Sequence, residues 1–245
     1  MFYKKALPLF LSILPLYAVT VDEVLDKMEE NENAATSRIA MTMTVIDAGG
    51  RETVSKLISY SADKGDKSLM EYVAPARIKG MKILTLNDGD DIWFYSPRTG
   101  RVRKIAGNQK NQSVNNSDFS YEDMSTSDRR EDYTCTLLPD TATGGVDCYS
   151  IEMTSKSGDI SYSRVVFYVD KKTNLPVEGH YFDEKGTLWK KLFMKNPGKV
   201  GNYWNAEVIE MHNVLKGSRT IMKTTRVEYD IDLDREMFSE RSLKR

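Results

Sequence analysis

The stretch DIWFYSPRTGRVRKI, residues 91–105, decides the fold class of this chain. Its first half is rich in aromatic residues, its middle holds Pro97 and Gly100, and its second half returns through a run of basic residues. Two strand-like runs joined by a short turn of this composition are typical of an antiparallel hairpin. The hairpin could be an ordinary part of a sheet, or it could form one wall of an apolar binding site with a charged outer face.

The same pattern continues on both sides of this hairpin. In residues 38–46, Ile39, Met41, Met43 and Val45 alternate with other residues, as in a strand with one apolar face. Further strand-like runs lie at residues 53–60, 67–73, 83–86, 133–138, 148–155, 162–169, 176–182, 188–194, 203–212 and 219–229. Nearly all are joined by short turns, including 87–90, 156–159, 171–174, 183–186 and 196–199, which are too short for the crossovers that parallel strands need.

This arrangement predicts a mainly β protein with a few short helices. A sheet of so many strands does not stay flat, because each strand twists relative to its neighbour. We therefore expect an unclosed antiparallel β-barrel, a curled meander sheet whose hydrophobic concave face is covered by helices. The helices are expected at residues 21–33, where apolar residues have helical spacing, near residues 121–127, and within residues 234–245.

Residues 1–18 are predicted to be a cleaved signal peptide. Lys4 and Lys5 precede an apolar run that ends at Ala18, and this order of basic, apolar and small residues is typical of secretion signals. The run is short for a bilayer and contains two prolines. We expect residues 19–245 to form a single soluble domain outside the cytoplasm, since no linker rich in Pro, Gly or Ser interrupts the pattern.

The charge of the chain argues against nucleic acid as a partner. Without Lys4 and Lys5, the 35 basic residues fall to 33 against 36 acidic ones, so the net charge is about −3. Domains that bind nucleic acid usually carry a basic patch or stripe instead.

Cys135 and Cys148, the only cysteines, flank a predicted turn that contains Gly144 and Gly145. A hairpin can bring two sulfur atoms together, and disulfides persist outside the cytoplasm. We therefore expect a disulfide between the two residues, which would stabilise the fold by roughly 2–3 kcal/mol. The alternative is a pair of unpaired buried thiols.

No catalytic signature is found in the sequence. His180 and His212 are the only histidines, and neither has the spacing of a metal ligand. A nucleophile elbow and a phosphate-binding glycine loop are both missing. The carboxylates in residues 228–236 alternate as they would at a solvated strand end. We therefore predict no enzyme activity, no cofactor and no metal site.

Two segments carry a resemblance to a known family. They are PARIKGMKILTLNDGDDIWFYSPRTGRVRKI, residues 75–105, and NNSDFSYEDM, residues 115–124. The chain resembles the periplasmic outer-membrane lipoprotein-sorting proteins, the LolA-like/LolB-like superfamily. The matching positions are Pro75, Lys79, Gly80, Trp93, Tyr95, Pro97, Ser117, Asp118, Phe119, Ser120, Tyr121, Glu122 and Asp123.

This resemblance implies an unclosed β-barrel in the periplasm of a Gram-negative bacterium, with acyl chains held on a concave face under helices. The chain has no cysteine near the predicted cleavage site, so the lipid anchor of the outer-membrane receptor is missing. That absence favours a diffusing carrier. The SDFSYEDM loop is not shared in this form by the best-known carrier, so the cargo could be lipoproteins or other lipids.

The apolar strand faces agree with such a trough, because the predicted helices are few and short for so much sheet. The expected lining is Ile39, Met41, Met43, Leu57, Trp93, Tyr95, Phe167, Trp189, Phe193 and Trp204. Flexible methionines suit chains of variable shape. The alternative is that these residues fill a closed core. In the empty form, we expect residues 21–33 or 117–124 to occupy the opening and to compete with cargo.

The densest basic cluster is Arg98, Arg101, Arg103, Lys104 and Lys110. It is either a solvated hairpin face or a contact for an anionic headgroup or an acidic patch on a membrane partner. For Asp118, Glu122 and Asp123, helix capping is the preferred interpretation.

The function that these observations predict is a non-catalytic periplasmic carrier. It would bind the acyl chains of a lipid or lipoprotein and move them between inner-membrane machinery, such as an ABC or RND-type exporter, and a transient outer-membrane acceptor. The alternative is a non-transporting interaction module, or an accessory protein of an inner-membrane exporter.

Overall fold

The computed structural model describes residues 19–31, 34–124, 129–157 and 161–245, so the predicted signal peptide, residues 1–18, lies outside the described residues. Its strands form one sheet in the order β6-β5-β4-β3-β2-β1-β13-β12-β11-β10-β9-β8-β7. The strand bounds are β1 (Thr36–Ile46), β2 (Glu52–Ala62), β3 (Lys67–Ala74), β4 (Lys82–Leu86), β5 (Asp91–Ser96), β6 (Arg101–Ile105), β7 (Tyr133–Thr143), β8 (Val146–Ser155), β9 (Arg164–Asp170), β10 (Pro176–Phe182), β11 (Leu188–Val200), β12 (Tyr203–Asn213) and β13 (Ser218–Tyr229).

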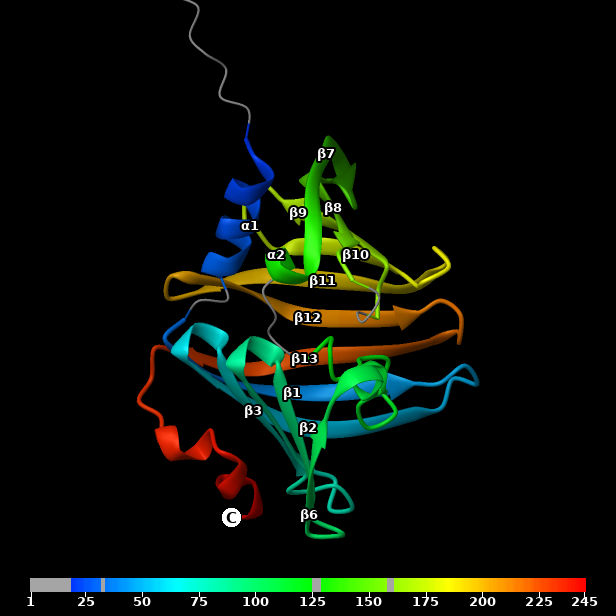
Figure 1. Cartoon of the computed structure of the whole chain (residues 1–245). Helices are drawn as coiled ribbons and strands as arrows, with labels where there is room; N and C mark the ends of the chain where they lie inside the picture. Colours follow the sequence, from blue (N-terminus) through cyan, green and yellow to red (C-terminus); the bar gives the residue numbers. More distant parts are fainter. Residues whose placement is uncertain (1–18, 32–33, 125–128, 158–160) are drawn as a thin grey trace, which may run out of the picture.

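The sheet consists of two antiparallel meanders that meet at its centre. β1 pairs with β13 over a long register, from Ser37 opposite Tyr229 to Ile46 opposite Arg219. The two edges are β6 and β7, which do not pair with each other. Figure 1 shows both ends of the sheet turning away from the direction of the central strands. The predicted unclosed, curled antiparallel sheet is therefore confirmed.

The helices are few and short, as predicted. They are α1 (Val21–Glu30), α2 (Arg129–Asp132) and the 3-10 segments η1 (Asp63–Gly65), η2 (Asn87–Gly89), η3 (Gly107–Asn111), η4 (Arg235–Met237) and η5 (Glu240–Lys244). Residues 121–124 form a turn instead of the predicted helix, and residues 125–128 lie outside the described residues. Among the residues described, no helix is long and apolar enough to cross a membrane.

The turn predicted at residues 196–199 is wrong, because β11 continues to Val200 and the chain reverses at residues 201–202. Pro197 lies opposite Ala206 within the β11–β12 pair. A proline fits a strand only where its missing N–H is not required. Asn196 has a positive φ of 53°, and the pairing keeps its register across this residue, with Lys195 opposite Val208 and Pro197 opposite Ala206.

The predicted disulfide is also wrong, although β7 and β8 do form the predicted hairpin. Cys135 lies opposite Met153, whereas Cys148 lies opposite Thr141. Met153 is five residues from Cys148 along β8, which corresponds to roughly 16 Å at about 3.3 Å per residue. A disulfide needs Cα atoms within about 7 Å. The two cysteines therefore form no disulfide with each other.

Buried side chains form two clusters on opposite faces of the sheet. The larger lies on the concave face and includes Met43, Leu57, Phe167, Leu192 and Met211. The smaller contains Leu69 and Leu84 and is closed by Phe238 and Leu243 of the C-terminal segment. Because successive strand residues point to opposite faces, adjacent residues such as Ile83 and Leu84 belong to different clusters.

Candidate functional site

The concave face is the candidate site, and its covers come from two segments outside the strands. One is α1, and the other is residues 107–124, here called the cover segment, which belongs to the connection between the edge strands β6 and β7. Figure 1 shows α1 near one end of the long central strands and the cover segment, in green, toward the other end. The two covers thus lie over different parts of the same apolar face.

Helix α1 buries its apolar stripe in the concave cluster. Thr20 caps the helix, accepting from the Glu23 N–H while the Glu23 carboxylate accepts from the Thr20 N–H. Val24, Leu25 and Met28, spaced for one helical face, are at most 2% exposed. Full burial of three such side chains contributes about 5–9 kcal/mol. The helix predicted at residues 21–33 is therefore confirmed for Val21–Glu30, and it packs onto the sheet, while residues 32–33 lie outside the described residues.

The polar attachments of α1 are partly exposed. Arg130 on α2 makes ion pairs with Asp26 and Glu29, the latter at 2.7 Å, with a longer contact of 3.7 Å to Asp22. Asn31, which follows the helix, donates to the Thr173 carbonyl and accepts from the Trp204 N–H. Exposed ion pairs of this kind each contribute about 0–1 kcal/mol. Apolar burial therefore holds α1 in place more than these contacts do.

The cover segment is a narrow hairpin on the concave face. The Val114 N–H donates to the Phe119 carbonyl, and Ser113 and Ser120 form an isolated bridge. Asn115 and Asn116 make its turn with positive φ values, a conformation that Asn tolerates better than most residues. The hairpin inserts apolar side chains into the concave cluster, namely Val114, Phe119, Tyr121 and Met124.

A buried ion pair joins the cover segment to the sheet. The Lys190 ammonium on β11 donates to the Asp123 carboxylate at 2.7 Å, and each side chain is 4% exposed. Tyr162 completes the group, because its hydroxyl accepts from Lys190 at 2.8 Å and donates to Asp123 at 2.7 Å. Burial, reinforced by Asp123, raises the pKa of the Tyr162 hydroxyl well above its ordinary value, so Tyr162 stays a donor.

Glu122 lies next to this group and is also poorly solvated. Its carboxylate contacts the Ser161 hydroxyl, which also contacts the side-chain oxygen of Asn111. Burial raises the pKa of the Glu122 carboxyl, and the Ser161 hydrogen bond opposes the shift. The acids of the SDFSYEDM motif thus hold the cover segment on the sheet. Within the described ranges, no group of three or more His, Cys, Asp or Glu side chains could hold a metal ion.

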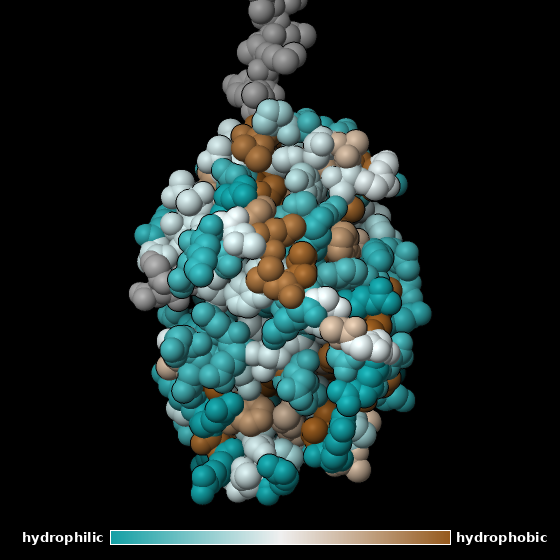
Figure 2. All heavy atoms as spheres, turned by 90° about the vertical axis from the view of Figure 1, so that its right-hand side faces the viewer, coloured by the Kyte–Doolittle hydropathy of each residue, from teal (hydrophilic) through white to brown (hydrophobic). Residues whose placement is uncertain are grey.

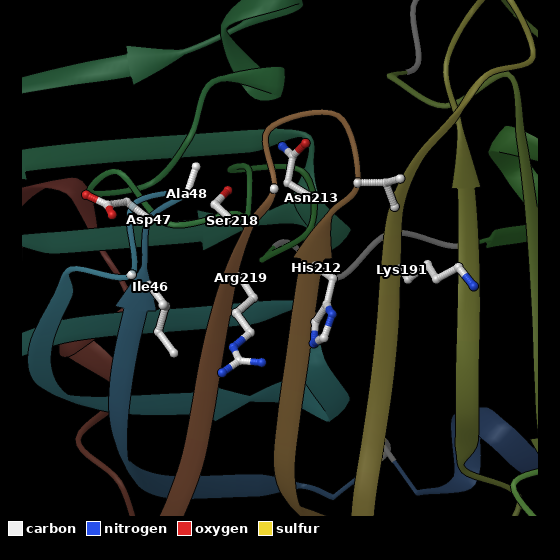
Figure 3. A pocket seen from close by; sticks show the side chains of 11 residues that line it. Ile46, Asp47, Ala48, Lys191, His212, Asn213, Ser218 and Arg219 are labelled. Carbon is white, nitrogen blue, oxygen red and sulfur yellow. The ribbon is translucent and has the colours of Figure 1, made fainter.

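The vacant trough expected from the sequence is filled in this structure by α1 and the cover segment. One hollow, of about 400 Å³, lies at the turn end of the sheet and is lined by Ile46, His212, Lys191 and Arg219 among others (Figure 3). These residues face away from the concave cluster, since their neighbours Leu192 and Met211 belong to it. Figure 2 looks onto this end and shows a mainly polar surface with scattered apolar patches.

The ten residues predicted to line the trough do not all share one face. Met43, Leu57 and Phe167 are buried in the concave cluster, and Met41 and Trp189 pack against it. Trp93 and Tyr95 pack on the opposite face with the C-terminal segment, contrary to the prediction.

The remaining three predicted residues lie outside both clusters. Phe193 contacts the His212 ring on the outer face, at a centroid distance of 4.9 Å, so its predicted place in the trough is not met. Ile39 and Trp204 are half-buried and belong to neither cluster. That any of the ten residues binds a ligand stays a prediction.

Four residues of the predicted basic cluster are exposed on the β5–β6 hairpin, whereas the fifth, Lys110, lies on η3 and is half-buried. Lys104 pairs with Asp91 and lies over the Trp93 ring, whereas Arg103 lies over the Phe94 ring. Lys110 donates to the Gly89 carbonyl. Arg98 and Arg101 are exposed. This surface is separate from the buried group at Lys190.

Lys190 and Tyr162 were not predicted as site residues. A signal for Lys190 is present in the sequence, because residues 190, 192 and 194 share one strand face and Leu192 and Met194 are apolar. A lysine in phase with apolar residues is expected to be buried and to need a partner.

Comparison with known proteins gives consistent matches over nearly the whole chain. A model of a family described as uncharacterized proteins matches residues 64–245. A putative outer-membrane lipoprotein-sorting protein domain from Vibrio parahaemolyticus is 26% identical with a TM-score of 0.85, covering 91% of this chain and 97% of that one. A DUF1329 family protein from Desulfovibrio piger is 30% identical with a TM-score of 0.84, covering 90% and 96%.

A third structure, a LolA superfamily protein from Nitrosomonas europaea, is 20% identical with a TM-score of 0.76, covering 91% of this chain and 99% of that one. At this identity the likeness shows the fold alone. No curated protein matches the chain.

Proposed function

This chain belongs to the LolA-like superfamily of outer-membrane lipoprotein-sorting proteins, and we propose that it is a periplasmic carrier for acyl chains. In this proposal the concave face binds the chains of a lipid or lipoprotein without catalysing a reaction. The observation that carries the proposal is that this apolar face is covered by α1, a separate helix outside the sheet. A cover of this kind can be exchanged for cargo while the strands remain paired.

The energies of cargo and cover are of comparable size. An acyl chain of about fifteen carbons offers roughly 12 kcal/mol gross if it is fully buried. It would displace Val24, Leu25 and Met28, whose burial contributes about 5–9 kcal/mol. The net free energy of binding is reduced further by the conformational entropy that the acyl chain loses when it is ordered. Such a carrier would hold its cargo and still release it.

Helix α1 is the cover that moves in this proposal. Its polar contacts are partly exposed, whereas the cover segment is held by buried groups such as Asp118 and Asp123. Breaking a buried ion pair costs about 3–5 kcal/mol, so the cover segment is the harder of the two to lift.

Lipid extraction tests this proposal. The mature protein would be purified from the periplasm, extracted with organic solvent and analysed by mass spectrometry for co-purified lipid. Retained acyl lipid, together with displacement of α1 seen as faster amide exchange in residues 21–30, would support the carrier. The control variant Met28→Leu should retain lipid, and Met28→Asp should favour the lifted helix.

The alternative is a non-transporting interaction module of the envelope, and the filled concave face favours it. In that case the protein would yield no lipid, and acyl probes would not bind. The exposed hairpin with Arg98 and Arg101 is then the candidate contact for a membrane partner, such as an inner-membrane exporter. For the carrier, donor machinery in the inner membrane and an acceptor in the outer membrane belong to the same proposal.

A further inference from the structure

Lys190 is buried beneath the cover segment, and one N–H of its ammonium makes no hydrogen bond to the described residues. The residue is 3% exposed, and its ammonium makes hydrogen bonds to Asp123 and Tyr162. An ammonium has three N–H donors. Two of them are used in these hydrogen bonds, and the ammonium also lies 5.0 Å from the centroid of the Trp189 ring, so the third N–H has no hydrogen-bond partner among the described residues.

A small polar hollow of about 40 Å³ opens beside this ammonium, between the cover segment and the sheet. Its lining includes Lys190, Lys216, Ser113, Ser117, Ser120 and Asn213. These side chains are rich in donors. The carboxylate in the lining, Asp118, already accepts from Ser218 and Thr220.

The hollow borders the concave cluster, because Phe119 of that cluster is part of its lining. Tyr162, which contacts Lys190, belongs to the same buried cluster as Leu25 and Met28 of α1. Trp189 also lines the hollow and packs against this cluster. An amphiphile could therefore place its polar group at Lys190 and extend its chain along the apolar face toward the part that α1 covers.

We propose that Lys190 binds an anionic group of the cargo, a carboxylate or a phosphate, which takes the place of the Asp123 carboxylate. This inference rests on the proposed carrier function. A ligand at this position receives charge-assisted hydrogen bonds from Lys190 and a further bond from Tyr162. An anionic group can replace the Asp123 carboxylate because it pairs with Lys190 in its turn, whereas an uncharged polar group would leave the buried ammonium without a counter-ion. The carrier therefore selects amphiphiles with an anionic group over uncharged ones.

The test compares two amphiphiles with the same acyl chain, both below their micelle concentrations. One is a lysophosphatidic acid, which has an anionic phosphate head, and the other is the monoacylglycerol, which has an uncharged head. Binding to the mature protein is measured by calorimetry. We expect the anionic probe to bind about tenfold more tightly. Inorganic phosphate as a competitor, and a fatty acid against its methyl ester, distinguish a free anion from phosphate-bearing and carboxylate-bearing amphiphiles.

Variants test whether Lys190 causes the preference for the anionic probe. Lys190→Met should remove this preference without weakening the binding of the uncharged probe, and Lys190→Arg should retain it. Asp123→Asn should strengthen anionic binding, because the competing carboxylate is gone, and it keeps the test valid where Lys190→Met does not fold. Asp140→Asn, at an exposed ion pair with Lys171, is the matched control and should change neither affinity.

The outcomes separate the two proposals. Equal binding of both probes, or a preference that survives in Lys190→Met, would overturn the anionic site and leave the carrier standing. Binding of neither probe would overturn both. Competition by inorganic phosphate alone at low concentration would show that a free anion, and not an amphiphile, is the ligand.

Discussion

Asp118 and Thr220 hold each other through two reciprocal hydrogen bonds of 2.8 Å. The Asp118 N–H donates to the Thr220 hydroxyl, and the same hydroxyl donates to the Asp118 carboxylate. Thr220 lies on β13 at the centre of the sheet and is 0% exposed. Asp118 therefore fastens the tip of the cover segment to β13, one of the two strands that join the meanders. The first aspartate of the SDFSYEDM motif thus bonds to the sheet and does not cap a helix, contrary to the prediction.

Asp118→Ala should lower the free energy of unfolding by about 1–3 kcal/mol, because the buried Thr220 hydroxyl loses its acceptor. Urea unfolding at neutral pH measures this change. Asp140→Ala is the control, since the Asp140 side chain is 53% exposed and pairs with Lys171 on the surface. Its effect should stay below about 1 kcal/mol. Equal losses of unfolding free energy in Asp118→Ala and Asp140→Ala would contradict a stabilising role for the buried hydrogen bonds between Asp118 and Thr220.

Arg130→Ala should loosen α1 with little change in global stability. The guanidinium faces Asp22, Asp26 and Glu29, and its side chain is 30% exposed, so the global loss should be below about 1 kcal/mol. The effect on the opening of α1 should be larger than the effect on global stability, because three acidic side chains of the helix lose the cation that they share. Amide hydrogen exchange in α1 should become faster in this variant. Arg226→Ala, which removes an exposed arginine paired with Glu228, should leave α1 unchanged.

Glu122 makes stability depend on pH in a defined direction. Burial raises the pKa of its carboxyl above the ordinary 4.5 in the folded state. The folded protein then binds the proton more tightly than the unfolded chain, so this group destabilises the fold as pH rises from 4.5 through the folded-state pKa. Glu122→Gln should remove this loss while keeping an acceptor for Ser161.

The measurement is the free energy of unfolding of the wild type and of Glu122→Gln across a pH series. The variant should gain stability relative to the wild type as pH rises above 4.5, and the difference should level off once pH exceeds the folded-state pKa. A difference that is constant over the whole series, or that has the opposite sign, would contradict the burial of this carboxyl.

The chemistry of the two cysteines can distinguish this structure from one that contains the disulfide expected from the sequence. Because Cys135 and Cys148 are out of register, a reductant should leave the thermal midpoint unchanged. Cys148 is 0% exposed and burial raises the pKa of its thiol, so it should react slowly with an alkylating reagent. Cys135, which is partly exposed, should be modified first. An intact mass two hydrogens below the reduced value would contradict this assignment.

Features set by neighbouring residues could be predicted from the sequence. Period-two alternation identified the strands, as in Met41, Met43 and Val45 of β1, because each inward position packs on the concave cluster. Short turns predicted the pairing of successive strands within each meander, but not the pairing of β1 with β13 that joins the two meanders. The cysteine register could have been predicted too, since a turn at Gly144 and Gly145 does not place residues 135 and 148 opposite each other.

Features set by distant segments could not be predicted in this way. Alternation shows that Trp93 and Tyr95 share one strand face, but it does not tell which face is concave. That choice depends on the C-terminal segment, whose Phe238 and Leu243 cover the outer side of these strands. The partnership of Lys190 with Asp123 joins residues 67 positions apart, so no local pattern could predict it.

Gly179 is a position where any side chain would collide with an aromatic ring. A Cβ atom there would lie 2.8 Å from Cε1 and 2.9 Å from Cδ1 of Phe167, which packs across the glycine from the neighbouring strand β9. Gly179→Ala should therefore shift Phe167 within the concave cluster and destabilise the protein by about 1–3 kcal/mol. Gly198→Ala is the matched control, since this strand glycine has nothing within 4 Å of the added atom and should cost little or nothing. Thermal unfolding of the two variants checks the difference, and near-ultraviolet circular dichroism should report the displaced ring in Gly179→Ala alone. Equal midpoints for the two variants would show that Phe167 does not pack tightly on the glycine.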